Sequence, residues 1–238
     1  MRAISSMATR GVLSALADAA ADAGLGPLEI ESVGGVDAAD RVAAGESFDL
    51  VFLASGALAR LAEAGALDAA TVTPLLLSQT AAAVPGRGVT SAAAPVGPDG
   101  EVETAFADAA ATREALRSAA RIGYSTGPSG TALVQLVEEW GLSSELADRL
   151  VRAKPGIPVA RSLAEGDVDL GFQQLSELVG ADGVRILGVL PEDCAIDTVF
   201  GGAVASTATD PAAAADVLAL FARAAAEGIA GAHSFRAV

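Results

Sequence analysis

The chain has 238 residues, which is long enough for one large domain or for two small lobes, each with its own core. Hydrophobic residues make up 52% of it and aromatic residues 4%, so the core must be built from Ala, Val, Leu and Ile. The 30 acidic residues against 15 basic ones give a net charge of −15, and such a surface repels nucleic acid and acidic membranes. A small anion is not excluded, because backbone N–H groups at helix N-termini can bind one whatever the net charge.

The sequence holds one cysteine, Cys194, and one histidine, His233. An internal disulfide is therefore impossible, and a zinc site is not expected. We expect no other metal and no cofactor. We also expect no membrane insertion, because charged residues interrupt the longest apolar stretch, from Pro211 to Ala232.

The first residues of the chain bear on its compartment. Arg2-Ala3-Ile4 already reads as a strand, so we find no secretory signal ahead of the fold. We expect a cytoplasmic protein if this start is the natural one, and a periplasmic or extracellular protein if a signal peptide has been removed.

Short apolar runs alternate with helical periodicity, which predicts βαβ units and a mainly parallel sheet flanked by helices. In chain order we predict a strand at 2–5, a helix at 7–23, a strand at 28–33, a helix at 38–44, a strand at 49–54, a helix at 58–64, a strand at 78–84 and a loop or crossover at 85–100. There follow a helix at 108–120, a strand at 121–124, helices at 131–140, 144–151 and 159–165, strands at 169–172, 185–190 and 198–206, and a helix at 211–226.

Serine and glycine recur where a predicted strand gives way to a helix. Ser5 and Ser6 follow the first strand, and Ser55 follows the third. Ligands of open α/β sheets bind at the carboxyl ends of the strands, so these hydroxyls are candidates for holding a ligand oxygen. The alternative is that Ser6 is only an N-cap.

The segment from Ser125 to Thr131 is the best local anion-binding candidate. It places four hydroxyls and two glycines between a strand and a helix, and no lysine follows, so it is not a Walker loop. The alternative is a Gly-Pro turn that only connects two elements. Gln173 and Gln174 follow another buried strand, and their amides can donate to an oxyanion or accept from a hydroxyl.

Several short motifs share an order and spacing with a known family. They are Ala3-Ile4-Ser5-Ser6, Val42–Glu46 leading into Asp49–Phe52, Pro128-Ser129-Gly130, Leu163–Gly166 leading into Leu170–Phe172, and Leu190–Asp193. With these motifs the chain resembles the type II solute-binding proteins almost end to end, especially the molybdate-binding family. The resemblance implies two α/β lobes joined by two crossovers, with lobe I at residues 1–80 plus 199–238, lobe II at 81–198, and a ligand cleft between them.

The resemblance carries over to the family's oxyanion-binding positions only in part. Ser6 matches the serine of the first loop, and Ser129 and Gly130 match the amides of the Pro-x-Gly turn. The second loop reads Gly34-Gly35-Val36 where the family has a serine, and Gln174 stands where the family has a tyrosine. These two replacements argue against molybdate itself and leave room for a larger carboxylate or another oxyanion. The candidate ligand-binding residues are Ser5, Ser6, Ser55, Ser125, Thr126, Ser129, Gly130, Thr131, Gln173 and Gln174.

The resemblance implies a protein that binds a small oxyanion or carboxylate, as the substrate-binding component of an ABC-type uptake system with a permease partner. We expect a monomer. An alternative is a cytoplasmic isomerase, similar to an aconitate-type isomerase, that shifts a double bond in a small di- or tricarboxylate. Tyr124, Lys154 and His233 are its only conventional bases besides carboxylates, and no catalytic residue is assigned. A cytoplasmic sensor domain is a third hypothesis.

Overall fold

The computed structural model describes residues 1–98, 100–154 and 156–238. Asp99, near the end of the predicted 85–100 loop, and Pro155, beside Lys154, lie outside the described residues. The chain forms two compact units, Met1–Ser78 with Val199–Val238 (unit 1) and Gln79–Thr198 (unit 2). The predicted α/β class is confirmed, and the predicted ligand cleft between two lobes stays a prediction.

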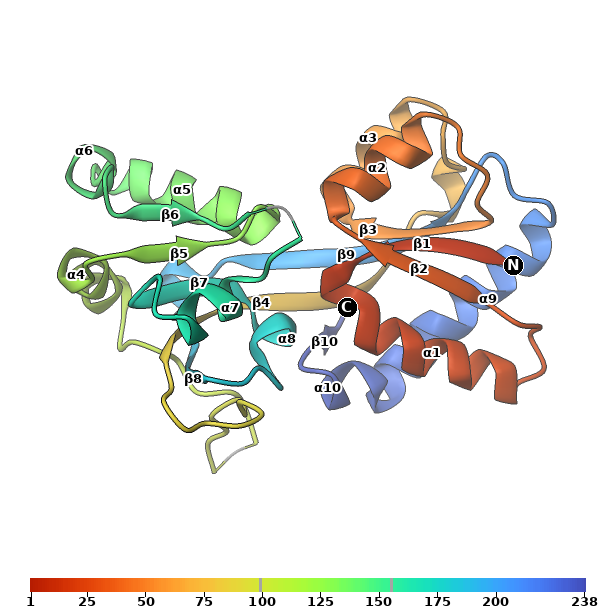
Figure 1. Cartoon of the computed structure of the whole chain (residues 1–238). Helices are drawn as coiled ribbons and strands as arrows, with labels where there is room; N and C mark the ends of the chain where they lie inside the picture. Colours follow the sequence, from red (N-terminus) through yellow and green to blue (C-terminus); the bar gives the residue numbers. More distant parts are fainter. Residues whose placement is uncertain (99, 155) are drawn as a thin grey trace. The chain divides into compact units, whose positions relative to one another are not determined.

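Unit 1 is a sheet with two helices on each face. The strands are β1 (Arg2–Ser6), β2 (Glu29–Val33), β3 (Leu50–Ala54), β9 (Asp197–Val204) and β10 (Arg236–Ala237). β1, β2 and β3 are parallel in the order β2-β1-β3, β9 is antiparallel to β3, and β10 pairs with β4 (Thr73–Pro85), which continues into unit 2. The helices are α1 (Arg10–Asp22) and α9 (Pro211–Ala224) on one face and α2 (Gly35–Ala43) and α3 (Ser55–Glu63) on the other (Figure 1). The other short elements are η1 (Met7–Thr9), η2 (Ala69–Thr71), η4 (Ala225–Ile229) and α10 (Ala230–Ala232).

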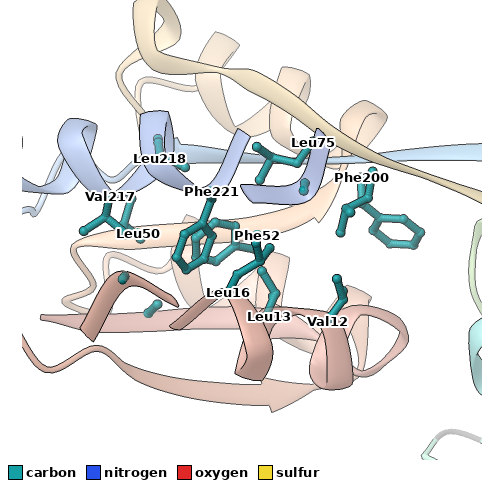
Figure 2. Close-up of a cluster of buried hydrophobic side chains, with 14 of the residues drawn as sticks. Val12, Leu13, Leu16, Leu50, Phe52, Leu75, Phe200, Val217, Leu218 and Phe221 are labelled. Carbon is teal, nitrogen blue, oxygen red and sulfur yellow. The ribbon is translucent and has the colours of Figure 1, made fainter. Parts of the chain in front are cut away.

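Two of the few aromatic rings in the chain stack on each other in the core under α1 and α9. Phe52 of β3 and Phe221 of α9 lie with ring centroids 5.4 Å apart and planes 21° apart, and Leu13 and Leu16 of α1 pack beside them (Figure 2). Ala3 of β1 belongs to this cluster, whereas its neighbour in sequence Ile4 belongs to the cluster under α2 and α3. Successive β1 side chains thus face opposite helix pairs, which decides where the serines at its end point.

Unit 2 is also a sheet with helices on both faces. β5 (Ile122–Tyr124), β6 (Leu150–Arg152) and β7 (Leu170–Gln174) are parallel in the order β7-β5-β6, and β4 pairs antiparallel with both β7 and β8 (Val184–Val189). One face packs against α4 (Ala109–Ser118), α5 (Pro128–Glu139) and α6 (Ser143–Leu146), and the other against α7 (Val159–Ala164) and α8 (Leu175–Leu178). The turn η3 (Glu192–Cys194) precedes β9.

Two glycines let α7 lie directly on the sheet. A Cβ on Gly171 of β7 would come within 2.7 Å of Val159 Cγ1 and 2.9 Å of Leu163 Cδ1, and one on Gly123 of β5 within 3.0 Å of Val159 Cγ1. Real Cβ atoms do not approach a neighbour so closely, so any larger residue at 171 would push α7 outward. The two glycines therefore allow α7 to approach β5 and β7 closely.

The structure corrects several predicted boundaries. The predicted helix at 144–151 is wrong in its second half, because α6 ends at Leu146 and Leu150 and Val151 form β6, whose pairing with β5 overrides the helical pattern. α2, α3 and α5 each begin three residues before the predicted start, at Gly35, Ser55 and Pro128. Glycine, serine and proline are tolerated there because first-turn N–H groups have no intrahelical partner in any case.

Candidate functional site

The carboxyl ends of the parallel strands of unit 1 meet at one edge of the sheet, and a helix starts there after each strand. β1 runs into η1, β2 into α2 and β3 into α3. The N-cap residues of α2 and α3 are Gly34 and Ala54, and neither makes a side-chain cap hydrogen bond. The first-turn N–H groups of both helices are therefore left without a capping side chain, at the positive end of each helix dipole.

Ser6 lies between these two helix starts. It is only 6% exposed, and by the alternation of β1 it faces α2 and α3. A Cβ on Gly35 would lie 3.6 Å from Ser6 Cβ, so the side chain packs against the first turn of α2. Its hydroxyl has no hydrogen-bond partner among the described residues, and it makes no N-cap bond. A buried hydroxyl left unpaired costs about 1–3 kcal/mol, which a bound acceptor would recover.

The other two predicted serines of unit 1 are occupied within the protein. Ser5 is fully buried on the opposite face, toward α1 and α9, and its Oγ lies 2.8 Å from Ser32 Oγ. The Ser55 hydroxyl donates to the Val199 carbonyl oxygen at 3.1 Å. The structure therefore does not bring the Ser5 hydroxyl to Ser6, and it leaves Ser55 to act only through its hydroxyl lone pairs or its backbone.

The 125–131 segment of unit 2 is a tightly bonded helix start. Ser125 Oγ lies 2.9 Å from Ser129 Oγ and accepts from the Gly130 N–H at 3.1 Å, and Thr131 Oγ1 donates to the Gly127 carbonyl at 3.4 Å. A Cβ on Gly130 would fall 1.9 Å from the Ser125 carbonyl oxygen, so only glycine fits. Thr126 is half-buried beside them. The buried hydroxyls of Ser125 and Ser129 thus stabilise the start of α5.

Gln173 and Gln174 point to opposite faces of the unit 2 sheet. Gln173 Oε1 accepts from the Ala160 N–H at the start of α7, at 3.2 Å. Gln174 Nε2 donates to Thr198 Oγ1 at 3.0 Å, while its Oε1 is buried without a partner among the described residues. Thr80 pairs with Gln174 across β4 and β7, and its buried hydroxyl also has no partner there. Because the Thr198 hydroxyl can donate or accept, the Gln174 amide can present either its oxygen or its nitrogen.

The sequence analysis missed three polar residues near these strand ends: Thr80, Thr198 and Glu177. Glu177 on α8 is partly buried, and desolvation raises the pKa of its carboxyl, although a side-chain hydrogen bond with Gln173 opposes the rise. Gln173 lies on β7 and Glu177 on α8, so the turn from strand to helix brings the two together, and their spacing in the sequence did not predict it.

The three conventional bases do not all belong to one unit. Tyr124 is half-buried at the end of β5, and Lys154 is exposed after β6. His233 belongs to unit 1, where its Nδ1 lies 3.6 Å from the position of a Cβ on Gly11. Residues 1–98, 100–154 and 156–238 contain no group of three or more His, Cys, Asp or Glu side chains arranged to hold a metal ion. In the same part of the chain, no helix has the length and apolar character needed to cross a membrane.

The fold of this chain is found in solved structures of other proteins. Similar solved structures include the periplasmic molybdate-binding protein of Azotobacter vinelandii (TM-score 0.74, 17% identity, 99% of this chain and 98% of that one) and the sulfate-binding protein SubI of Mycobacterium tuberculosis (TM-score 0.71, 18% identity, 100% and 86%). The substrate-binding domain of a putative molybdenum ABC transporter from Clostridium difficile is similar as well (TM-score 0.71, 15% identity, 100% and 98%). The chain has the type II periplasmic-binding-protein fold that the sequence analysis predicted.

The family follows from the sequence. Residues 1–236 match the bacterial extracellular solute-binding protein family, and the chain belongs to that family. A curated relative, the aconitate isomerase of a Pseudomonas species, is 32% identical over 108 residues. That match covers 45% of this chain and 41% of the relative, so it spans less than half of either protein.

Proposed function

We propose that this solute-binding protein binds a small oxyanion or carboxylate, as the substrate-binding component of an ABC-type uptake system, and works outside the cytoplasm with a permease. The observation that carries the proposal is the buried, unpartnered hydroxyl of Ser6 between the uncapped starts of α2 and α3. A hydroxyl and two sets of backbone N–H groups form a neutral set of donors that suits an anion. Relatives of the same fold named for molybdate and for sulfate support the ligand class.

A calorimetric titration tests this proposal. The wild-type protein should bind at least one of sulfate, molybdate, tungstate, citrate and the two aconitates. Ser6→Ala should weaken that binding at least about 10-fold, the effect of losing one hydrogen bond to a charged group. Ser14→Ala on the exposed surface of α1 is the matched control and should bind as the wild type does. No binding of any of these anions at millimolar concentration, or unchanged binding by the Ser6 variant, would contradict the proposal.

A second candidate function is isomerisation of a tricarboxylate, favoured by the partial match to aconitate isomerase and by Glu177. A carboxylate with a raised pKa is a stronger base than an ordinary one and can accept and return a proton. In such a reaction Glu177 would take a proton from the methylene carbon of the substrate. The double bond would shift by one carbon, and the proton would return at the far end of the three-carbon unit. Gln173 would hold the carboxyl in place.

Incubation of the protein with cis- or trans-aconitate in D2O separates the two functions. An isomerase forms the other isomer, incorporates deuterium and loses turnover in Glu177→Gln. A pure binding protein leaves both isomers unchanged and unlabelled. Turnover that survives the Glu177 substitution would rule out this residue as the base.

A further inference from the structure

Three buried polar side chains of unit 2 form a cluster whose hydrogen bonds are incomplete. Thr80 of β4 pairs in register with Gln174 of β7, so their side chains are direct neighbours on one face of the sheet. Gln174 Nε2 donates to Thr198 Oγ1 at 3.0 Å, which brings Thr198 into the same group. Thr80 is 1% exposed and Gln174 2%, yet the Thr80 hydroxyl and Gln174 Oε1 have no partner among the described residues. We call these three residues the threonine–glutamine cluster.

The packing of unit 2 does not account for the hydroxyl of Thr80. Its backbone is already satisfied, because its N–H donates to the Ile196 carbonyl oxygen and its carbonyl oxygen accepts from the Leu190 N–H, each at 3.0 Å. The next register pair on the same face, Ala82 with Phe172, lies in the apolar core under α4, α5 and α6. A valine in place of Thr80 would have nearly the same shape and would avoid burying an unpaired polar group. The hydroxyl therefore points to a partner outside the chain.

A ligand hydroxyl suits the threonine–glutamine cluster in both orientations of the Gln174 amide. With Oε1 unpaired, the ligand hydroxyl donates to Oε1 and accepts from Thr80. With the amide turned over, so that Oε1 accepts from Thr198, the ligand hydroxyl accepts from Nε2 and donates to Thr80.

An ionised oxygen suits the cluster less well. A carboxylate or sulfate oxygen only accepts hydrogen bonds, so it fits the second orientation of the amide and is repelled by Oε1 in the first. The three side chains are all neutral, and burying a charge among neutral groups costs far more than burying a hydroxyl. The cluster thus favours an uncharged group that both donates and accepts.

We propose that Thr80, Gln174 and Thr198 bind a hydroxyl group of the ligand, so that the natural ligand is a hydroxycarboxylate. An unsubstituted carboxylate or a fully ionised inorganic oxyanion would leave the cluster unsatisfied. This inference rests on the proposed function in one respect, since it takes the ligand from the class of small carboxylates. It makes no use of the Ser6 hydroxyl.

The test uses pairs of acids that differ by one hydroxyl group: citrate with tricarballylate, and each enantiomer of malate with succinate. In calorimetric titrations the wild-type protein should bind the hydroxy acid of at least one pair about 10-fold more tightly than its partner, or more, as expected for hydrogen bonds made in a buried site. The ratio of the two dissociation constants within a pair is the measurement, so that the acid groups common to both members cancel.

Variants of the cluster should remove this preference. Thr80→Val and Gln174→Met keep the approximate size of each side chain, and each should bring the ratio within about 3-fold while leaving the acid without the hydroxyl bound about as in wild type. Thr80→Ser keeps the hydroxyl and should retain the preference. Thr90→Val, on the exposed surface of unit 2, is the matched control and should behave as wild type. Melting temperatures show whether each variant is folded.

The outcomes separate this inference from the function on which it rests. If the wild-type protein binds acids but the hydroxyl makes no difference, or if Thr80→Val and Gln174→Met keep the full preference, the hydroxyl site is wrong and the proposed function stands. Equal weakening of both members of a pair also overturns it, as does loss of the preference in Thr80→Ser, because the cluster then acts through packing. If the wild-type protein binds no anion at all, the proposed function itself is wrong.

Discussion

Replacing Gly171 by alanine should destabilise the protein by about 1–3 kcal/mol, the usual cost of overpacking a core. The new Cβ would lie 2.7 Å from Val159 Cγ1 and 2.9 Å from Leu163 Cδ1, so α7 must move outward by several tenths of an ångström. That movement also stretches the 3.2 Å hydrogen bond from the Ala160 N–H to Gln173. In a chain of this length the loss corresponds to a melting temperature lower by roughly 2–12 °C.

Thermal unfolding followed by circular dichroism measures this effect. Gly26→Ala is the matched control, because nothing lies within 4 Å of the added methyl group there. The double variant Gly171→Ala/Val159→Ala removes the closest contact, so its destabilisation should be smaller than the sum of the two single effects. A melting temperature of Gly171→Ala equal to that of the control, or full additivity in the double variant, would refute the packing of α7 described above.

Three further substitutions test other parts of the structure. Gly130→Ala should prevent α5 from starting as observed and cost about 3 kcal/mol or more, because its Cβ would meet the Ser125 carbonyl oxygen at 1.9 Å. Gly127→Ala is the control, because its Cβ would meet only Ser125 Oγ, at an ordinary contact distance of 3.9 Å, and equal melting temperatures for the two variants would contradict the site geometry. Burial raises the pKa of the Asp49 carboxyl, but the three hydrogen bonds that it accepts outweigh burial and lower the pKa overall. Chemical denaturation should therefore show that Asp49→Ala costs about 1.5–3 kcal/mol at neutral pH and less as the pH falls below about 4. A cost independent of pH would refute this. Burial raises the pKa of the Glu177 carboxyl, so folding favours its protonated form, and the contribution of Glu177 to stability falls as the pH rises above about 4. The stability of Glu177→Gln relative to wild type should therefore increase with rising pH. A constant difference in stability from about pH 4 to 8 would contradict the burial of Glu177.

The alternation of strands and helices could be predicted from the sequence because apolar runs and helical periodicity are local signals. The edge at which strands give way to helices could be predicted for the same reason, and Ser6 was among the residues expected there. The helix starts at Gly35, Ser55 and Pro128 were missed, since residues typical of loops also suit a first helical turn. β6 was missed because its strand conformation depends on pairing with β5, a partner distant in sequence.

The orientation of neighbouring side chains was beyond the sequence analysis. Ser5 and Ser6 were predicted together, yet they face opposite helix pairs, and so do Gln173 and Gln174. Adjacent residues at a strand end must point to opposite faces, but which of the two meets open backbone donors depends on the helices packed there.

The central claim is that an anion binds at the Ser6 hydroxyl between the starts of α2 and α3. Crystals grown with tungstate test it most directly, because the anomalous signal of tungsten locates the anion without reference to the protein. We predict a peak whose oxygens lie about 2.7–3.2 Å from Ser6 Oγ and from first-turn N–H groups of α2 or α3, and the loss of that peak in Ser6→Ala crystals. A tungstate bound elsewhere on the protein, with the Ser6 hydroxyl still unpartnered, would contradict the account.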